Sequence, residues 1–201
     1  MRFCIALSVM LLLQISVDGQ VMSASIRLAD SYFDAGDYAR AEAEYATIRE
    51  DSMPPWEQAI LLYDLGTVLM AAGKYEEALT RFQAAEALAT GLPLLEQRLS
   101  ANRALANLMI VKAHLKTLQG NVEANNRDYY RTILLFRQLD RNIKTATSAW
   151  CALALAKGAM QCPPSLNLEE MQSEVQSLYT ELLNGYVAFS QQQLSQKMGQ
   201  H

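Results

Sequence analysis

Residues 28–45 read LADSYFDAGDYARAEAEY, and residues 65–82 read LGTVLMAAGKYEEALTRF. The second segment repeats the pattern of the first at an offset of 37 residues. The matched pairs are Leu28 and Leu65, Ala29 and Gly66, Tyr32 and Leu69, Gly36 and Gly73, Tyr38 and Tyr75, Ala41 and Ala78, and Tyr45 and Phe82. A fixed period of this length is the sequence signature of a repeat architecture, so the two segments predict two copies of one structural unit.

Each copy predicts a pair of helices joined by a tight turn. In the second copy, Leu65 and Leu69 lie one helical turn apart and therefore share a face. Gly73 follows the last turn, where a left-handed glycine closes a helix without a Cβ penalty. Tyr75 and Phe82 then restart the same periodicity on a second helix. One such hairpin cannot bury its apolar face alone, so we expect it to pack against neighbours.

The spacing resembles that of the tetratricopeptide repeat, a helical hairpin of about 34 residues that stacks into a solenoid. The resemblance implies an all-α fold, a right-handed helical solenoid of antiparallel helix hairpins. It also implies a protein that binds other proteins and is not an enzyme. An ordinary helical bundle is the alternative, which the matched offsets in two copies disfavour. Small residues at the matched positions predict that paired helices approach closely: Ala29, Ala41, Gly66 and Ala78.

The pattern divides the chain into a repeat domain and a C-terminal helix. Residues 20–164 are predicted to form the repeat domain, with repeats at 22–55 and 59–92, a degenerate third unit at 94–139 and an extra helix at 143–161. Residues 165–197 are predicted to form an amphipathic helix with an apolar stripe: Met171, Val175, Leu178, Leu182, Tyr186 and Phe189. We expect this helix to cap the last apolar face of the solenoid, and the alternative is a dimerisation arm.

The N-terminus predicts an export signal. Arg2 gives a positive start, residues 3–17 are mostly apolar, and Gly19 ends a sequence that resembles a signal-peptidase site. Residues 1–19 are therefore predicted to be a cleaved signal peptide, which makes the mature protein periplasmic or secreted. The alternative is an uncleaved membrane anchor, although this segment is shorter than the roughly 20 residues that span a bilayer. With this leader, the chain resembles exported bacterial tetratricopeptide repeat proteins, which serve envelope assembly, secretion and membrane-complex scaffolding.

Cysteine placement adds one further expectation. Cleavage would remove Cys4 and leave Cys151 and Cys162. On one continuous helix these two residues would lie roughly 16 Å apart, which is beyond disulfide reach. We therefore expect two buried, unpaired thiols. A bridge would require the helix to break, for example at Gly158.

Composition argues against several functional classes. The 201 residues are 51% hydrophobic with 9 Gly and 5 Pro, which suits a helical fold and argues against disorder. A formal net charge of -4 without any run of Lys or Arg argues against nucleic acid as a partner. The histidines, His114 and His201, lack cysteines or carboxylates at ligand spacing, so we expect no metal, no cofactor and no catalytic residue.

The resemblance also indicates where a partner binds, because the first helix of each hairpin lines the groove in this family. The groove positions are Ile26, Asp30 and Phe33 in the first copy, and Tyr63, Thr67 and Met70 in the second, with Asp64 beside them. We expect Asp30 and Thr67 to be exposed, whereas the alternative for Ile26 and Phe33 is packing against the next hairpin. Some family members grip a C-terminal carboxylate with basic residues. The acidic groove here repels a carboxylate and favours a basic or amphipathic peptide.

Together these features predict an exported, non-catalytic adaptor or scaffold that binds another envelope or secreted protein through this groove. Two alternatives remain open. One is a self-associating structural protein that uses the C-terminal helix, and the other is a repeat-type secretion chaperone if the N-terminus is not a signal peptide. A membrane-associated complex and a homo-oligomer are both compatible with the sequence.

Overall fold

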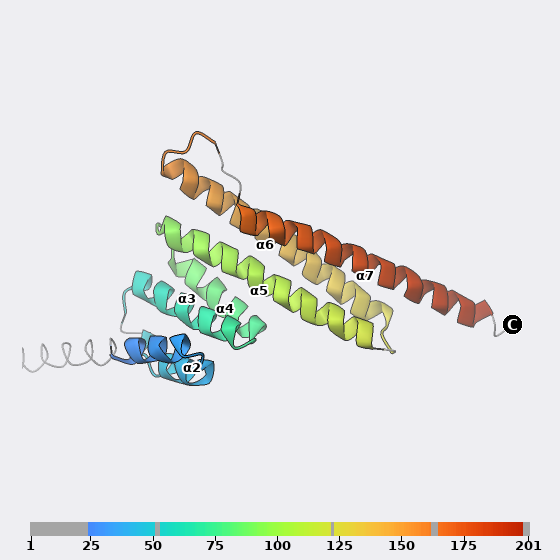
Figure 1. Ribbon diagram of the computed structural model, residues 1–201, viewed down its shortest axis with the longest axis horizontal. Coiled ribbons are helices and arrows are strands. Elements are labelled where there is room, and N and C mark those ends of the chain that lie inside the picture. The colour runs from blue at the N-terminus through green and yellow to red at the C-terminus, as the bar shows by residue number, and fades with distance from the viewer. Residues whose placement is uncertain (1–23, 51–52, 122, 162–164, 199–201) are drawn as a thin grey trace, which may run out of the picture. The chain divides into compact units, whose positions relative to one another are not determined.

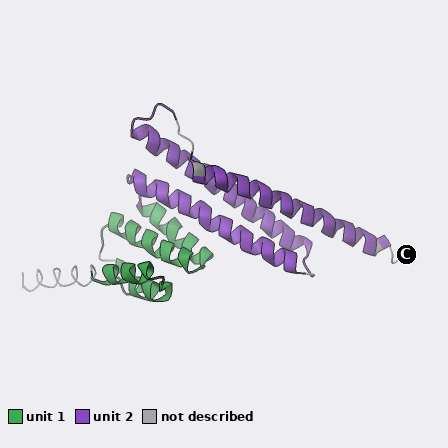
Figure 2. Cartoon of the chain, in the orientation of Figure 1, with its two compact units in different colours: residues 1–88 green, residues 89–201 purple. Residues whose placement is uncertain are grey.

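The computed structural model describes residues 24–50, 53–121, 123–161 and 165–198 (Figure 1). Within these ranges the chain forms α-helices and no β-strand, which confirms the predicted all-α repeat fold. The chain divides into two compact units, residues 1–88 and residues 89–201 (Figure 2). The predicted signal peptide, residues 1–19, lies outside the described residues.

The first unit consists of two helix hairpins. A helix over residues 24–34 precedes α2 (Tyr38–Ala46), and α3 (Pro55–Ala71) precedes α4 (Tyr75–Leu88). The helix α3 packs against α4 and also contacts α2. Proline at the start of α3 is favourable, because the first turn of a helix has no use for its missing N–H group.

The turns of both hairpins have the same geometry. Gly36 and Gly73 have φ angles of 76° and 77°, values that only glycine adopts without strain. The residue after each glycine donates its backbone N–H back into the preceding helix, Asp37 to Tyr32 at 2.9 Å and Lys74 to Leu69 at 2.9 Å. This is the Schellman ending of a helix, and it confirms both glycines as the predicted helix stops.

Close approach between α3 and α4 depends on Gly66. A Cβ atom at this position would lie 2.5 Å from the ring atom Cε1 of Phe82, which is too close for any real contact. Phe82 is fully buried, as are Ala29, Ala41 and Ala78. Small residues on one side therefore accommodate a large ring on the other, as the repeat pattern predicts.

The second unit consists of three longer helices. They are α5 (Pro93–Gly120), α6 (Asn126–Ala156) and α7 (Leu166–Met198). The helices α5 and α6 run antiparallel, and α7 packs against both (Figure 1). Asn125 caps α6 in a reciprocal capping box, since its side chain accepts from the Arg127 N–H and its own N–H donates to Asp128.

The predicted break between residues 139 and 143 is wrong. The helix α6 runs without interruption to Ala156, so the predicted separate helix at 143–161 is largely its C-terminal half. The segment contains neither glycine nor proline. Leu139, Ile143 and Ala146 are all buried and continue one helical stripe at steps of four and three.

The expectation of unpaired thiols is also wrong for Cys151. This residue is half-buried and disulfide-bonded, and both other cysteines, Cys4 and Cys162, lie outside the described residues. The expectation assumed one continuous helix beyond Cys151. Instead α6 stops at Ala156, because Gly158 adopts a φ of 92° and closes the helix.

The predicted apolar stripe of the C-terminal helix faces the other helices of its unit. Leu182 is buried, and Met171, Val175 and Leu178 pack against the core that α5 and α6 share. The Phe136 ring on α6 meets the Tyr179 ring on α7 edge-on, with centroids 5.3 Å apart. This stripe therefore caps the α5–α6 pair. Among the described helices, none has the length and apolar character needed to cross a membrane.

Candidate protein-binding site

One face of α3 carries the second set of predicted groove residues. Tyr63, Thr67 and Met70 recur at steps of four and three, and all three are half-buried. Thr67 is therefore less exposed than expected, and its hydroxyl donates to the Tyr63 carbonyl at 2.9 Å within the helix. The Tyr63 ring contacts the buried ring of Phe82, with centroids 6.1 Å apart. Contacts within the hairpin thus hold this face in place.

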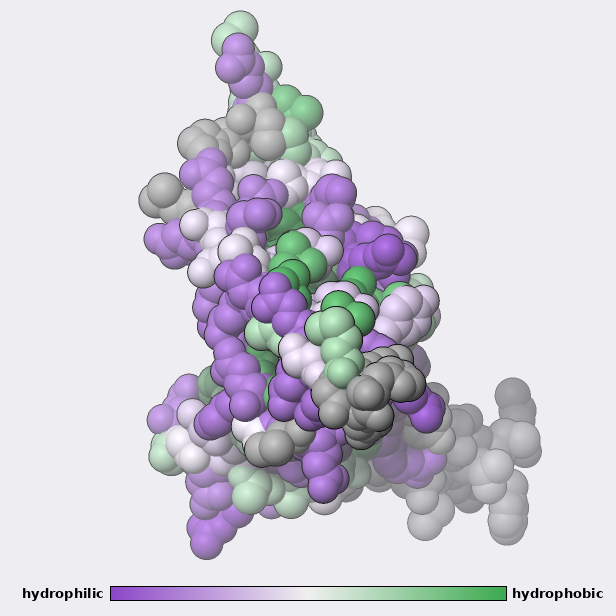
Figure 3. Space-filling view, turned by 90° about the vertical axis from the view of Figure 1, so that its right-hand side faces the viewer, coloured by the Kyte–Doolittle hydropathy of each residue, from purple (hydrophilic) through white to green (hydrophobic). Residues whose placement is uncertain are grey.

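The same face extends beyond the residues that the sequence indicated. Trp56 and Ile60 precede Tyr63 at the same spacing, and they are 51% and 41% exposed. Extending the groove stripe backwards by two steps would have found them. Figure 3 shows that hydrophobic residues also reach the surface in small patches among hydrophilic ones. A large aromatic side chain that is half exposed at the start of a repeat helix is a strong candidate contact for a partner.

The helix over residues 24–34 carries the first set. Ile26 and Phe33 are half-buried, whereas Asp30 is exposed as expected. The Phe33 ring packs against the Tyr38 ring of α2, with centroids 5.6 Å apart. The Phe33 ring therefore already packs within its own hairpin. Of this set, Asp30 is the residue whose side chain is exposed.

A polar cluster links the two hairpins of the first unit. The buried Tyr45 hydroxyl donates a hydrogen bond of 2.6 Å to Asp30 Oδ1. Burial and this hydrogen bond hold the pKa of Tyr45 above its usual value, so Tyr45 remains a donor at neutral pH. Burial, and secondarily the negative charge of Asp30, raise the pKa of Asp64 from 3.8 to about 6. The cluster therefore holds two carboxyl groups close enough to repel each other.

Sequence reasoning missed the role of Tyr45. Its position in the repeat predicts a buried core residue, and the side chain is indeed buried. Its hydroxyl also fixes the orientation of Asp30 from the second helix of the hairpin. The sequence did contain a signal for this role. Tyr45 matches Phe82 of the second copy, and a buried tyrosine hydroxyl needs a hydrogen-bond partner, which a phenylalanine ring does not.

The structure also describes the placement of the side chains that could bind a metal ion. Among the described residues, no group of three or more His, Cys, Asp and Glu side chains is placed to hold a metal ion. His114 lies half-buried on α5. The two carboxyl groups of the polar cluster, Asp30 and Asp64, are suited to bind a positively charged group.

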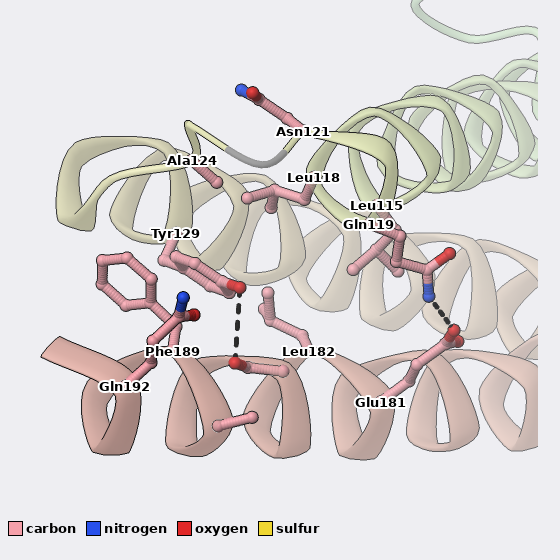
Figure 4. A pocket seen from close by; sticks show the side chains of 12 residues that line it. Leu115, Leu118, Gln119, Asn121, Ala124, Tyr129, Glu181, Leu182, Phe189 and Gln192 are labelled. Atoms are coloured by element: carbon pink, nitrogen blue, oxygen red, sulfur yellow. Dashed lines mark hydrogen bonds between the residues drawn. The ribbon is translucent and has the colours of Figure 1, made fainter. Parts of the chain in front are cut away.

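The second unit contains a cavity of about 300 Å³ between its three helices (Figure 4). The Tyr129 hydroxyl donates to the Gly185 carbonyl of α7 at 3.3 Å, and the Gln119 amide donates to Glu181. The Tyr129 and Phe189 rings pack with centroids 5.2 Å apart. These polar and aromatic groups connect α7 to α5 and α6, so the lining serves helix packing.

Comparison with protein families agrees with the hairpin geometry. The family model described as tetratricopeptide repeat matches residues 26–93 and again residues 63–134, which together span more than half of the chain. The chain belongs to the tetratricopeptide repeat family. Tetratricopeptide repeats generally form protein–protein interaction modules. Comparisons with curated proteins and with solved structures found no match.

The second match extends from the first compact unit into the second, where the predicted third repeat unit lies. It includes all of α5 and the first turns of α6. These helices have 28 and 31 residues, compared with 17 and 14 in α3 and α4. This hairpin is therefore longer than the one formed by α3 and α4, and α7 packs on the apolar core that its two helices share.

Proposed function

We propose that this tetratricopeptide repeat protein is an exported, non-catalytic adaptor that binds a basic or amphipathic segment of another protein. The binding face consists of the α3 stripe, Trp56, Ile60, Tyr63, Thr67 and Met70, together with Asp30 and Asp64. The exposed apolar end of this stripe is the observation that carries the proposal, because such residues at a repeat-helix face are typical binding anchors.

The carboxyl groups of the polar cluster support the proposal that the partner is basic. Asp30 is exposed and held by Tyr45, so an incoming Lys or Arg meets an oriented carboxylate. Asp64 is partly protonated near pH 6 and ionised above it. A cation placed between the two carboxylates would relieve their repulsion. Binding of a basic segment is therefore stronger at pH 7.5 than at pH 5.

The binding test compares two double variants in crosslinked co-purification from the native host. Tyr63→Ala with Met70→Ala removes the centre of the proposed face, whereas Thr80→Ala with Gln83→Ala changes two exposed residues of α4. We expect the first variant to lower recovery of a captured partner at least tenfold, which corresponds to about 1.4 kcal/mol. The α4 variant should recover the partner like the wild type. Equal recovery in both variants contradicts the proposed face, provided that circular dichroism shows both folded.

Export is supported by the apolar N-terminal sequence and by the disulfide at Cys151, since disulfides persist in oxidising compartments. Intact-mass measurement of the protein from its native host should give a chain that begins at Gln20. Cleavage there removes Cys4, and Cys162 is then the one remaining partner within the chain. A non-reducing peptide map should therefore join Cys151 to Cys162. An intact N-terminus at Met1 would contradict cleavage and favour the anchored or cytoplasmic alternatives.

A further inference from the structure

The helix α7 carries a second apolar stripe that faces away from its own unit. Leu183, Val187, Leu194 and Met198 are 42%, 53%, 60% and 72% exposed. Their spacing of four, seven and four residues places them on one side of the helix. The packed residues Met171, Val175, Leu178 and Leu182 occupy a different side. We name the exposed set the outer stripe.

The C-terminal part of α7 extends beyond the turn between α5 and α6 (Figure 1). Gln192 is the last α7 residue that lines the cavity beside this turn. Leu194 and Met198 therefore belong to a projecting helical segment.

Leu183, Val187 and Leu194 of the outer stripe lie in an uncharged stretch, and Met198 follows Lys197. Residues 182–196 contain no acidic and no basic residue, and the polar positions are Asn, Ser, Gln and Tyr. A helix that lies on a membrane surface is typically rich in Lys and Arg on its polar face. A surface without charge is instead compatible with a copy of itself, because the two faces do not repel each other.

The spacing of the outer stripe is symmetric. Read from either end, the intervals are four, seven and four, and the midpoint falls between Ser190 and Gln191. If two α7 helices pair in antiparallel orientation about this midpoint, Leu183 meets Met198 of the second copy and Val187 meets Leu194. A twofold axis produces this kind of self-complementary interface.

We propose that two copies of this chain associate through the outer stripes of α7, in antiparallel orientation about a twofold axis between Ser190 and Gln191. The paired segment, residues 183–198, is roughly 24 Å long at the helical rise. A contact of this length is smaller than a standard stable interface, so the dimer is weak and depends on concentration.

The first test is sedimentation velocity of the full mature chain across a concentration series. Leu194→Glu introduces a charge into the outer stripe, whereas Gln196→Glu introduces the same charge at an exposed position away from it. We expect the wild type and Gln196→Glu to shift from monomer to dimer over the same range. Leu194→Glu should require at least tenfold higher concentration. A wild type that stays monomeric throughout, or a dimer that Leu194→Glu leaves unchanged, overturns the proposal.

The second test determines orientation. Val187→Cys and Leu194→Cys variants, carrying tags of different size, are oxidised separately and as a mixture, with the wild type as background for the native cysteines. The antiparallel arrangement predicts a mixed disulfide dimer that forms only when both variants are present. A parallel arrangement would crosslink each variant with itself. Circular dichroism of each variant establishes that the helices are intact. The readouts do not involve the α3 face, so failure here leaves the adaptor proposal standing.

Discussion

Replacing Phe82 with alanine is expected to lower the free energy of unfolding of the first unit by about 3–5 kcal/mol. The ring is fully buried between α3 and α4, and it packs against Gly66 and the Tyr63 ring. Its removal loses the transfer free energy of the ring and leaves a cavity that the hairpin cannot close. Urea denaturation followed by circular dichroism measures this loss as a lower midpoint.

A second substitution makes this test more specific. In the wild type, Gly66→Ala places a Cβ atom 2.5 Å from Phe82 Cε1, and we expect the resulting strain to cost about 1–3 kcal/mol. In the Phe82→Ala background the ring is absent. There, Gly66→Ala should leave the free energy of unfolding unchanged or raise it by up to about 1 kcal/mol, because alanine favours the helix more than glycine does. The same effect of Gly66→Ala in both backgrounds would contradict the proposed contact between residues 66 and 82.

The second large effect is a pH-dependent stabilisation by Asp64→Asn. The pKa of Asp64 is raised from 3.8 to about 6 in the folded chain. Between pH 3.8 and about pH 6, Asp64 is therefore protonated in the folded state and ionised in the unfolded state. The stabilising contribution of the neutral carboxyl is fully present below pH 3.8, and it is lost as the pH rises through 6. Asparagine mimics the neutral form at every pH.

We therefore expect Asp64→Asn to be close to the wild type in stability near pH 4. Above pH 6 it should be more stable by on the order of 1–3 kcal/mol. Urea denaturation of both proteins at several pH values measures the difference. Asp34→Asn is the matched control, because it removes the same charge from an exposed position outside the cluster. A stability difference that does not change between pH 4 and pH 8 would contradict the raised pKa of Asp64.

The hairpins of the first unit could be predicted because their deciding features are local. Gly36 and Gly73 end their helices through hydrogen bonds that span only a few residues, and the glycine itself indicates the conformation. The prediction of a helix break near residue 139 was wrong because the sequence there contains no local signal that ends a helix. No glycine or proline was present to stop α6, and the buried stripe through Leu139 and Ile143 continued across the assumed boundary.

The candidate site was harder to predict from the sequence, because it depends on contacts between side chains on different helices. Helical spacing alone places Tyr63, Thr67 and Met70 on one face, but it does not indicate that Tyr45 holds Asp30 from another helix. Likewise, the raised pKa of Asp64 results from burial and from a carboxylate on a different helix. The disulfide at Cys151 was the less favoured alternative, because the sequence does not show whether Gly158 continues the helix or adopts the left-handed conformation that ends it.

The packing order of the helices has a consequence for how this chain folds. In both units the principal partners are consecutive helices, with α3 against α4 and α5 against α6. Contacts between neighbours in sequence require little loop closure, and proteins rich in such contacts fold quickly. Each hairpin can therefore form as soon as its own two helices are available. The contacts of α7 with α5 and α6 are the last of this unit to form during synthesis, since α7 follows both helices in the chain.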